Sequence, residues 1–219
     1  MIHKHQHFDL LQKVVLERVV FEPPLRANAS MHNEACFLFA IKGQSHLYSS
    51  DEHYSFKSSD GVIMKCGSYL NNWYDADGEG PAEAVAVHFY PDVLKHVYDD
   101  QLPDFLVAEA DHLTKRIHRI KTDEIYKKYI DGLIFYFENP DLVNNDLIKL
   151  KVKEIILLLV NADSTGNTVK ILRDMFNPYE YDFKQVIEKH LYDDLSLEEL
   201  AILTNKSLST FKRLFKDVY

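Results

Sequence analysis

LSLEELAILTNKSLSTFKRLFKDVY, residues 195–219, is the stretch whose pattern says most about the fold. Ser196 is followed three residues later by Glu199. This is the spacing of a capping box, in which each side chain hydrogen-bonds the backbone N–H of the other residue at the start of a helix. The apolar residues that follow share one helical face: Leu197, Leu200 and Ala201. We therefore predict a first helix after Ser196, with small Ala201 where a second helix crosses closely.

A turn and a second helix follow directly. Thr204-Asn205-Lys206 breaks the apolar pattern, and Asn tolerates the left-handed conformation that a tight turn requires. Ser207 is a second N-cap candidate. One stripe of the next helix is apolar and is predicted to be buried: Leu208, Phe211, Phe215 and Val218. Two capped helices joined by a short turn form a helix-turn-helix.

The opposite face of the second helix carries hydrogen-bond donors. Ser209, Lys212, Arg213 and Lys216 are spaced i, i+3, i+4, i+7 and point the same way. A recognition helix uses such residues in the major groove, where Arg reads guanine edges and Lys and Ser contact phosphates or bases. The predicted DNA contacts are Ser207, Ser209, Thr210, Lys212, Arg213 and Lys216. The alternative is a solvated amphipathic helix with no partner.

Residues 182–219 resemble the first helix-turn-helix of AraC/XylS-type transcription regulators, and are especially similar to the branch that activates type III secretion genes. The positions that carry the resemblance are Leu197, Leu200, Ala201, Ser207, Phe211, Arg213 and Phe215. The family carries two such motifs, and this sequence ends just after the first. The resemblance therefore implies an incomplete DNA-binding domain, which buries little surface and is expected to bind double-stranded DNA weakly and in a salt-sensitive way.

Composition fits a modular regulator. The 219 residues have 46% hydrophobic content, enough for a sizeable core, and apolar runs such as residues 155–160 are far shorter than a membrane span. Cys36 and Cys66 form neither a disulfide framework nor a zinc motif. We expect a soluble cytoplasmic protein. The net charge of −9 argues against nucleic-acid binding by the whole chain, but residues 205–219 hold four cations and one anion, a local basic site.

Residues 1–90 are predicted to form β-strands. Short apolar or alternating segments are separated by turn signals such as Lys42-Gly43 and Asp60-Gly61, a pattern typical of a sandwich or barrel. The expected strands are 14–21, 35–41, 46–48, 54–56, 62–65 and 84–89. The family resemblance implies a cupin-like sensor domain here, whose effector is a small molecule or a protein.

Aromatic side chains of this region are candidates for an effector pocket. The candidates are six aromatic residues and one histidine: Phe37, Phe39, Tyr48, Tyr69, Trp73, Tyr74 and His88. Simple core packing is the alternative for each of them.

Two groups of histidines raise the question of a metal. Cupin metal sites use two close histidines, a glutamate and a distant histidine, whereas this chain offers only His32, Glu34 and His88, one histidine short. A second group alternates onto one strand face near the chain end: His3, His5 and His7. We expect no metal, no cofactor and no enzyme activity, because no catalytic motif appears. A metal-dependent cupin enzyme remains an alternative.

Residues 91–177 are predicted to be helical. Helices are expected at 92–100, from Asp123 to about residue 138, at 146–160 and at 169–176. The 146–160 helix is apolar on both sides. This indicates that the helix is either buried on two sides within the chain or contacts a partner protein with one of them. In the family, helices after the barrel mediate dimerisation, so we expect a homodimer through helices between residues 123 and 160; burial against the barrel is the alternative. Residues 178–181 are the expected linker to the motif in 182–219.

The predicted fold is thus α+β: a cupin-like barrel or sandwich, a helical dimerisation layer and a C-terminal helix-turn-helix. A second interpretation is a regulatory module that lacks independent DNA binding and works through protein contacts.

Overall fold

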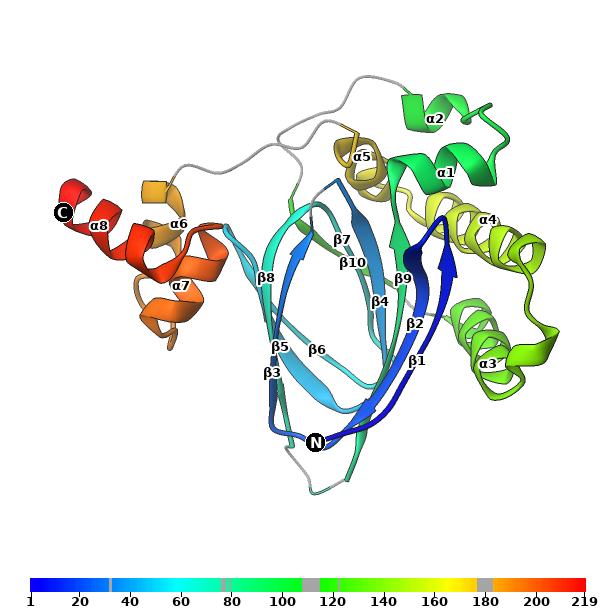
Figure 1. The fold of residues 1–219 in the computed structure, drawn as a ribbon, viewed down its shortest axis with the longest axis horizontal. Coiled ribbons are helices and arrows are strands. Elements are labelled where there is room, and N and C mark those ends of the chain that lie inside the picture. Colours follow the sequence, from blue (N-terminus) through cyan, green and yellow to red (C-terminus); the bar gives the residue numbers. More distant parts are fainter. Residues whose placement is uncertain (32, 76–77, 79, 108–114, 122, 177–182) are drawn as a thin grey trace.

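The computed structural model describes residues 1–31, 33–75, 78, 80–107, 115–121, 123–176 and 183–219. Two antiparallel sheets face each other and form a barrel-like sandwich (Figure 1). Sheet A has the order β1-β2-β9-β4-β7-β10, with β1 Ile2–Leu10, β2 Lys13–Phe21, β9 Ala82–Phe89, β4 Ala35–Lys42, β7 Gly61–Met64 and β10 Ile117–Ile120. Sheet B has the order β3-β8-β5-β6, with β3 Leu25–Met31, β8 Gly67–Tyr74, β5 Gln44–Tyr48 and β6 His53–Lys57.

Strand alternation divides each sheet into an inner and an outer face. In β4, Cys36 and Leu38 pack with residues of the barrel interior, whereas Phe37 and Phe39 pack with the helices outside. Phe21 and Phe56 each meet Trp73 edge-on inside the barrel. The interior of the barrel is therefore an apolar core of its own.

Gly43 shows how closely the two sheets approach at the β4–β5 turn. Its φ is +104°, and a Cβ built on it would lie 2.7 Å from Cβ of Ala82. Both the positive φ and the short distance require glycine, which fits its prediction as a strand-ending residue.

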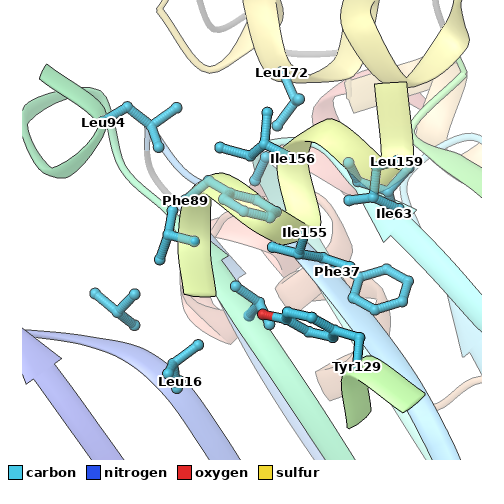
Figure 2. Packing of buried hydrophobic residues seen from close by; sticks show 14 of the residues in the cluster. Leu16, Phe37, Ile63, Phe89, Leu94, Tyr129, Ile155, Ile156, Leu159 and Leu172 are labelled. Carbon is cyan, nitrogen blue, oxygen red and sulfur yellow. The ribbon is translucent and has the colours of Figure 1, made fainter. Parts of the chain in front are cut away.

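Helices cover the outer face of sheet A. They are α1 Pro91–Val97, α2 Asp104–Val107, α3 Glu124–Glu138, the 3₁₀ turn η1 Pro140–Leu142, α4 Asn145–Ala162 and α5 Asn167–Asp174. Figure 2 shows aromatic and aliphatic side chains of strands and helices meeting in one cluster, with Phe37 and Ile63 from sheet A beside Tyr129, Ile155 and Leu159 from α3 and α4. This helix–sheet core is the largest apolar cluster of the described residues.

Local sequence sets the helix boundaries in this layer. Asp123 caps α3 by accepting a hydrogen bond from the Ile125 backbone N–H, and Asn144 caps α4 in the same way. Tyr126 and Tyr129 of α3 donate their hydroxyl protons to backbone carbonyls of α4. The two helices are thereby fixed side by side.

The outer face of sheet B is covered by a different unit. The helices α6 Phe183–Lys189, α7 Leu197–Leu203 and α8 Leu208–Val218 lie beside β3, β5 and β8, on the opposite side of the barrel from α3 and α4 (Figure 1). We call residues 183–219 the C-terminal unit. Its apolar contact with the barrel is small, with Leu70, Val186 and Leu203 fully buried in it.

The α+β class and the cupin-like arrangement are as predicted, and the six expected strands are present within a few residues. Sequence patterns missed β1, β3, β8 and β10. β1 and β3 are mostly exposed edge strands, so their sequences lack the alternation of a half-buried strand. β10 lies beyond residue 90, the predicted end of the barrel, but it pairs with β7. Sheet A therefore includes a strand from the region predicted to be helical.

Two further expectations concern the linker and membranes. The expected linker, residues 178–181, lies outside the described residues. Among the described helices, none has the length and apolar content needed to cross a bilayer.

Candidate nucleic-acid interface

The motif read from the sequence is a pair of capped helices. Glu199 donates its backbone N–H to the Ser196 hydroxyl, and the Glu199 carboxylate accepts the Ser196 backbone N–H at 2.8 Å, so the capping box is complete. Asn205 adopts φ +55° in the turn, as predicted. Ser207 caps α8 by accepting a hydrogen bond from the Thr210 backbone N–H. The sequence therefore encodes both helix starts and the turn between them.

A small apolar core holds the three helices together. Ile187 of α6, Ala201 of α7 and Phe211 of α8 are buried against one another, and Phe183 packs on Phe211 with 5.3 Å between ring centroids. Small Ala201 lies at the helix crossing, as its size predicts. This core fixes the direction of α8.

The predicted buried stripe of α8 is only partly buried. Phe211 is buried and Leu208 is half-buried, but Phe215 and Val218 are exposed. The expectation of four buried residues is wrong for the last two, because α6 and α7 cover only the first turns of α8. Phe215 instead contacts the rings of Phe211 and Tyr219.

The polar face of α8 is open to solvent. Ser209, Lys212, Arg213 and Lys216 are exposed, and the structure records no ion pair for these three cations within the part of the chain that it describes. Lys206 in the turn is exposed as well. The basic side chains are free to meet a polyanion, since no acidic neighbour in the described residues neutralises them.

The hydroxyls at the start of α8 are partly committed within the helix. Ser207 Oγ lies 3.1 Å from Ser209 Oγ and donates to Thr210 Oγ1 at 3.0 Å. Ser207 stays exposed, but its oxygen is used as the cap, and Thr210 is half-buried. Of the predicted hydroxyl contacts, Ser209 is therefore the exposed one that does not serve as a helix cap.

The contact between the C-terminal unit and the barrel includes polar residues that sequence analysis did not single out. Nε2 of buried His190 donates to the Ser49 carbonyl at 2.5 Å, and Nδ1 donates to Asp193 at 2.6 Å. Arg26 of β3 donates to Glu199, which completes the capping box of α7, at 3.0 Å. These partners are 141 and 173 positions apart in the chain, so no sequence spacing could reveal them.

The seven predicted effector-pocket residues do not share one pocket. Tyr69 and Trp73 lie in the apolar interior of the barrel, and His88 lies on the same inner face of sheet A as Cys36. The other four point elsewhere: Phe37 and Phe39 into the helix–sheet core, Tyr48 toward the C-terminal unit, and Tyr74 beside His46 on the outer face of sheet B. The grouping is corrected because alternate strand residues face opposite sides of a sheet.

His88 is the centre of a polar cluster at the inner face of sheet A. Its Nδ1 lies 2.6 Å from Glu34 and its Nε2 lies 3.3 Å from Glu17, which also contacts His5 at 2.6 Å. Burial lowers the pKa of His88, but its polar neighbours more than offset this and hold the pKa well above the ordinary value. Burial raises the pKa of the Cys36 thiol, so this neighbour stays neutral. We therefore assign the raised pKa of His88 to the carboxylates of Glu17 and Glu34. The hydrogen bond from His88 in turn lowers the pKa of Glu17.

The candidate metal residues have carboxylate partners. His3, His5 and His7 contact Glu22, Glu17 and Asp9 respectively, one each. His32 lies outside the described residues. Within the described ranges, no group of three or more histidine, cysteine or acidic side chains is arranged to hold a metal ion.

The family model described as the ExsA N-terminal regulatory domain matches residues 35–171, more than half of the chain. No curated protein matches the sequence.

Among solved structures, the chain matches ToxT from Vibrio cholerae O395 bound to (E)-4-(8-methylnaphthalen-1-yl)but-3-enoic acid. The identity is 11% and the TM-score is 0.47, and the match covers 92% of this chain and 94% of that one. Unsaturated fatty acid-bound ToxT from V. cholerae strain SCE256 matches at 10% identity and TM-score 0.46, covering 93% and 91%. A cupin 2 conserved barrel protein from Salinispora arenicola CNS-205 matches at 17% identity and TM-score 0.36, covering 45% and 84%.

A cupin-like barrel followed by a helix-turn-helix is the arrangement that the resemblance to AraC-type transcription regulators predicted. Within that class, the chain belongs to the family of the ExsA N-terminal regulatory domain.

Proposed function

We propose that this protein binds double-stranded DNA through the exposed polar face of α8 and that the barrel regulates this binding. The observation that carries the proposal is the open basic stripe formed by Lys212, Arg213 and Lys216 beside Ser209. A helix placed in the major groove by its partner helix uses such donors for guanine edges and phosphates.

The geometry assigns different tasks to these residues. Ser209 stands at the N-terminal end of α8, the end that enters the groove in helix-turn-helix proteins, and Lys212 and Arg213 stand one turn further on. Arg213 suits bidentate contact with guanine, whereas Lys212 and Lys216 suit phosphates. We therefore expect Arg213 to contribute to sequence preference and Lys216 to contribute mainly to affinity.

The test is binding of the full chain to fluorescent duplex DNA, measured by anisotropy over a range of salt concentrations. The double variant Lys212→Ala/Arg213→Ala should weaken binding at least about tenfold, and should reduce the slope of log K against log salt by about one because the phosphate contact of Lys212 is lost. Lys127→Ala/Lys128→Ala, two exposed cations on α3, is the matched control with the same charge change. Equal loss in both variants would mean that net charge alone drives the binding.

We also propose a homodimer through α3 and α4. The supporting observation is a set of exposed apolar residues on these helices: Ile125, Phe135, Leu150 and Leu157. Leu150 and Leu157 are seven residues apart, so they lie on one face of α4, opposite its buried stripe. Leu150→Glu/Leu157→Glu should shift the mass in light scattering from dimer to monomer, whereas Val107→Glu, at an equally exposed apolar position on α2, should not. A wild-type monomer at all concentrations would overturn the dimer.

A further inference from the structure

His190 lies at the junction between the C-terminal unit and the barrel. It follows α6, its side chain has no solvent exposure, and its ring reaches across to the β5–β6 turn. Nε2 is 2.5 Å from the carbonyl oxygen of Ser49, and Nδ1 is 2.6 Å from Oδ2 of Asp193. The ring is thus bound on both nitrogens, once within its own unit and once to the barrel.

Both partners of this ring are acceptors. A backbone carbonyl has no proton to donate, and neither has an ionised carboxylate. Each ring nitrogen must therefore carry a proton, but a neutral imidazole has only one N–H. The two hydrogen bonds can exist together only when His190 is the imidazolium cation.

Charged and titratable side chains face this junction from every element around it. Asp193 accepts from His190 and lies 3.9 Å from His53 of β6. The others are Asp51 and Glu52 in the β5–β6 turn, Tyr48 of β5 at 6.4 Å between ring centroids, Asp194 beyond α6, Glu199 of α7 and Arg26 of β3. Asp51 is itself paired with Arg116, whose Nε lies 3.7 Å from its Oδ1.

We propose that His190 is a proton-dependent latch that holds the C-terminal unit on the outer face of sheet B. Loss of the second proton removes one of the two hydrogen bonds and leaves a buried acceptor without a donor. The remaining contact is small, with Leu70, Val186 and Leu203 as its buried residues and the Arg26–Glu199 pair at its edge. Docking should therefore weaken as the pH rises, while the helix–sheet core on the other side of the barrel stays intact.

Hydrogen–deuterium exchange of the full chain tests the latch without any DNA. Wild type, His190→Gln and the control His96→Gln, in α1, are compared at about pH 6 and about pH 9 after correction for intrinsic exchange. In wild type and in the control, protection of α6 and α7 should fall about tenfold or more between the two pH values, the size expected for losing a hydrogen bond to a charged group. Gln at position 190 keeps a side-chain N–H donor but cannot titrate, so in His190→Gln the protection of α6 and α7 should be low at both pH values. Equal pH dependence in wild type and His190→Gln would overturn the proposal.

Long-range ¹H–¹⁵N NMR of the wild-type protein gives a second test that needs no variant to fold. In the docked state both nitrogens of His190 should have the chemical shifts of protonated ring nitrogens, and the change to a neutral ring should coincide with loss of protection in α6. A docked His190 with one unprotonated nitrogen would overturn the latch. Neither readout involves DNA, so a failed latch and a failed DNA-binding proposal are distinguishable.

Discussion

The barrel carries helices on both of its outer faces, and the two contacts are built differently. On sheet A, strand and helix side chains merge into one large apolar core that includes Phe37, Val85 and Ile155. On sheet B, the C-terminal unit touches the barrel through a small apolar cluster and a few polar pairs, among them His190–Ser49 and Arg26–Glu199. The free energy of apolar burial scales with the buried area and does not depend on protonation. The two hydrogen bonds of a buried imidazolium, in contrast, require both ring protons, so one of them is lost when the ring becomes neutral.

This difference suggests that the two groups of helices have different roles. The helices on sheet A complete the folding unit of the barrel, because without them its outer face would expose a continuous apolar surface. The C-terminal unit has its own core around Phe211 and rests on the barrel through a contact that can be released. If the two faces differ in this way, substitutions in the core on sheet A should destabilise the whole barrel, whereas substitutions in the contact on sheet B should affect only the C-terminal unit.

Phe37→Ala should have the largest effect. The side chain is fully buried between sheet A and Tyr126, and removing a buried phenylalanine costs about 3–5 kcal/mol of unfolding free energy. Trp73 is the single tryptophan of the sequence and lies in the barrel interior, so its fluorescence during urea unfolding reports the barrel. Val107→Ala, at an exposed apolar position on α2, should change the transition little. Equal effects of the two variants would contradict the core described for sheet A.

Leu203→Ala should destabilise the C-terminal unit by about 2–3 kcal/mol. This is the lower part of the range for a buried leucine, because Leu203 lies in the small contact between this unit and the barrel. Exchange in α6–α8 should increase while the Trp73 transition stays in place. A matching downward shift of the Trp73 midpoint would show that both faces unfold as one cooperative unit.

His88→Gln should alter the pH dependence of barrel stability. The pKa of His88 is raised in the folded state, so its contribution is complete below the unfolded value of about 6.5 and is lost as the pH rises through the folded pKa. Wild type should therefore lose stability between about pH 6.5 and the folded pKa, and the variant should show a flatter profile. The variant should also be less stable near pH 6 by about 1–3 kcal/mol, since Glu17 and Glu34 lose a partner. Parallel pH profiles would show that His88 does not carry this dependence.

Arg26→Ala should have the smallest effect. The arginine is largely exposed, so its pair with Glu199 contributes no more than about 1 kcal/mol to docking, and less at high salt. Exchange in α7 should rise slightly at low salt and become indistinguishable from wild type at high salt. A large salt-independent effect would mean that Arg26 supports more than this one pair.

Local signals allowed much of this molecule to be predicted from its sequence. The capping box at Ser196, the left-handed Asn205 and the buried stripe of α4 were all encoded within one or two helical turns, and the structure confirms them. Alternating apolar strands were found for the same reason. Prediction was weakest for edge strands such as β1, whose polar histidines hide the pattern.

The parts that depend on distant residues were not predictable. Phe37 and Trp73 are both aromatic strand residues, and only the strand pairing shows that one faces the helices and the other the barrel interior. His190 has its barrel partner 141 residues away, and Phe215 is exposed because no described helix covers the end of α8. The basic face of α8 was predicted from spacing alone, and its exposure agrees with the prediction while its role in DNA binding stays a proposal.

Photo-crosslinking can compare the two sides of the barrel for proximity to DNA. A photo-crosslinking amino acid is placed at Ser209 on the polar face of α8, or at Leu150 on the exposed face of α4, and the full chain is irradiated with duplex DNA. We predict crosslinks from position 209 and none above background from position 150. Crosslinks from position 150 alone, or from neither position under conditions in which anisotropy shows binding, would contradict the placement of α8 on DNA.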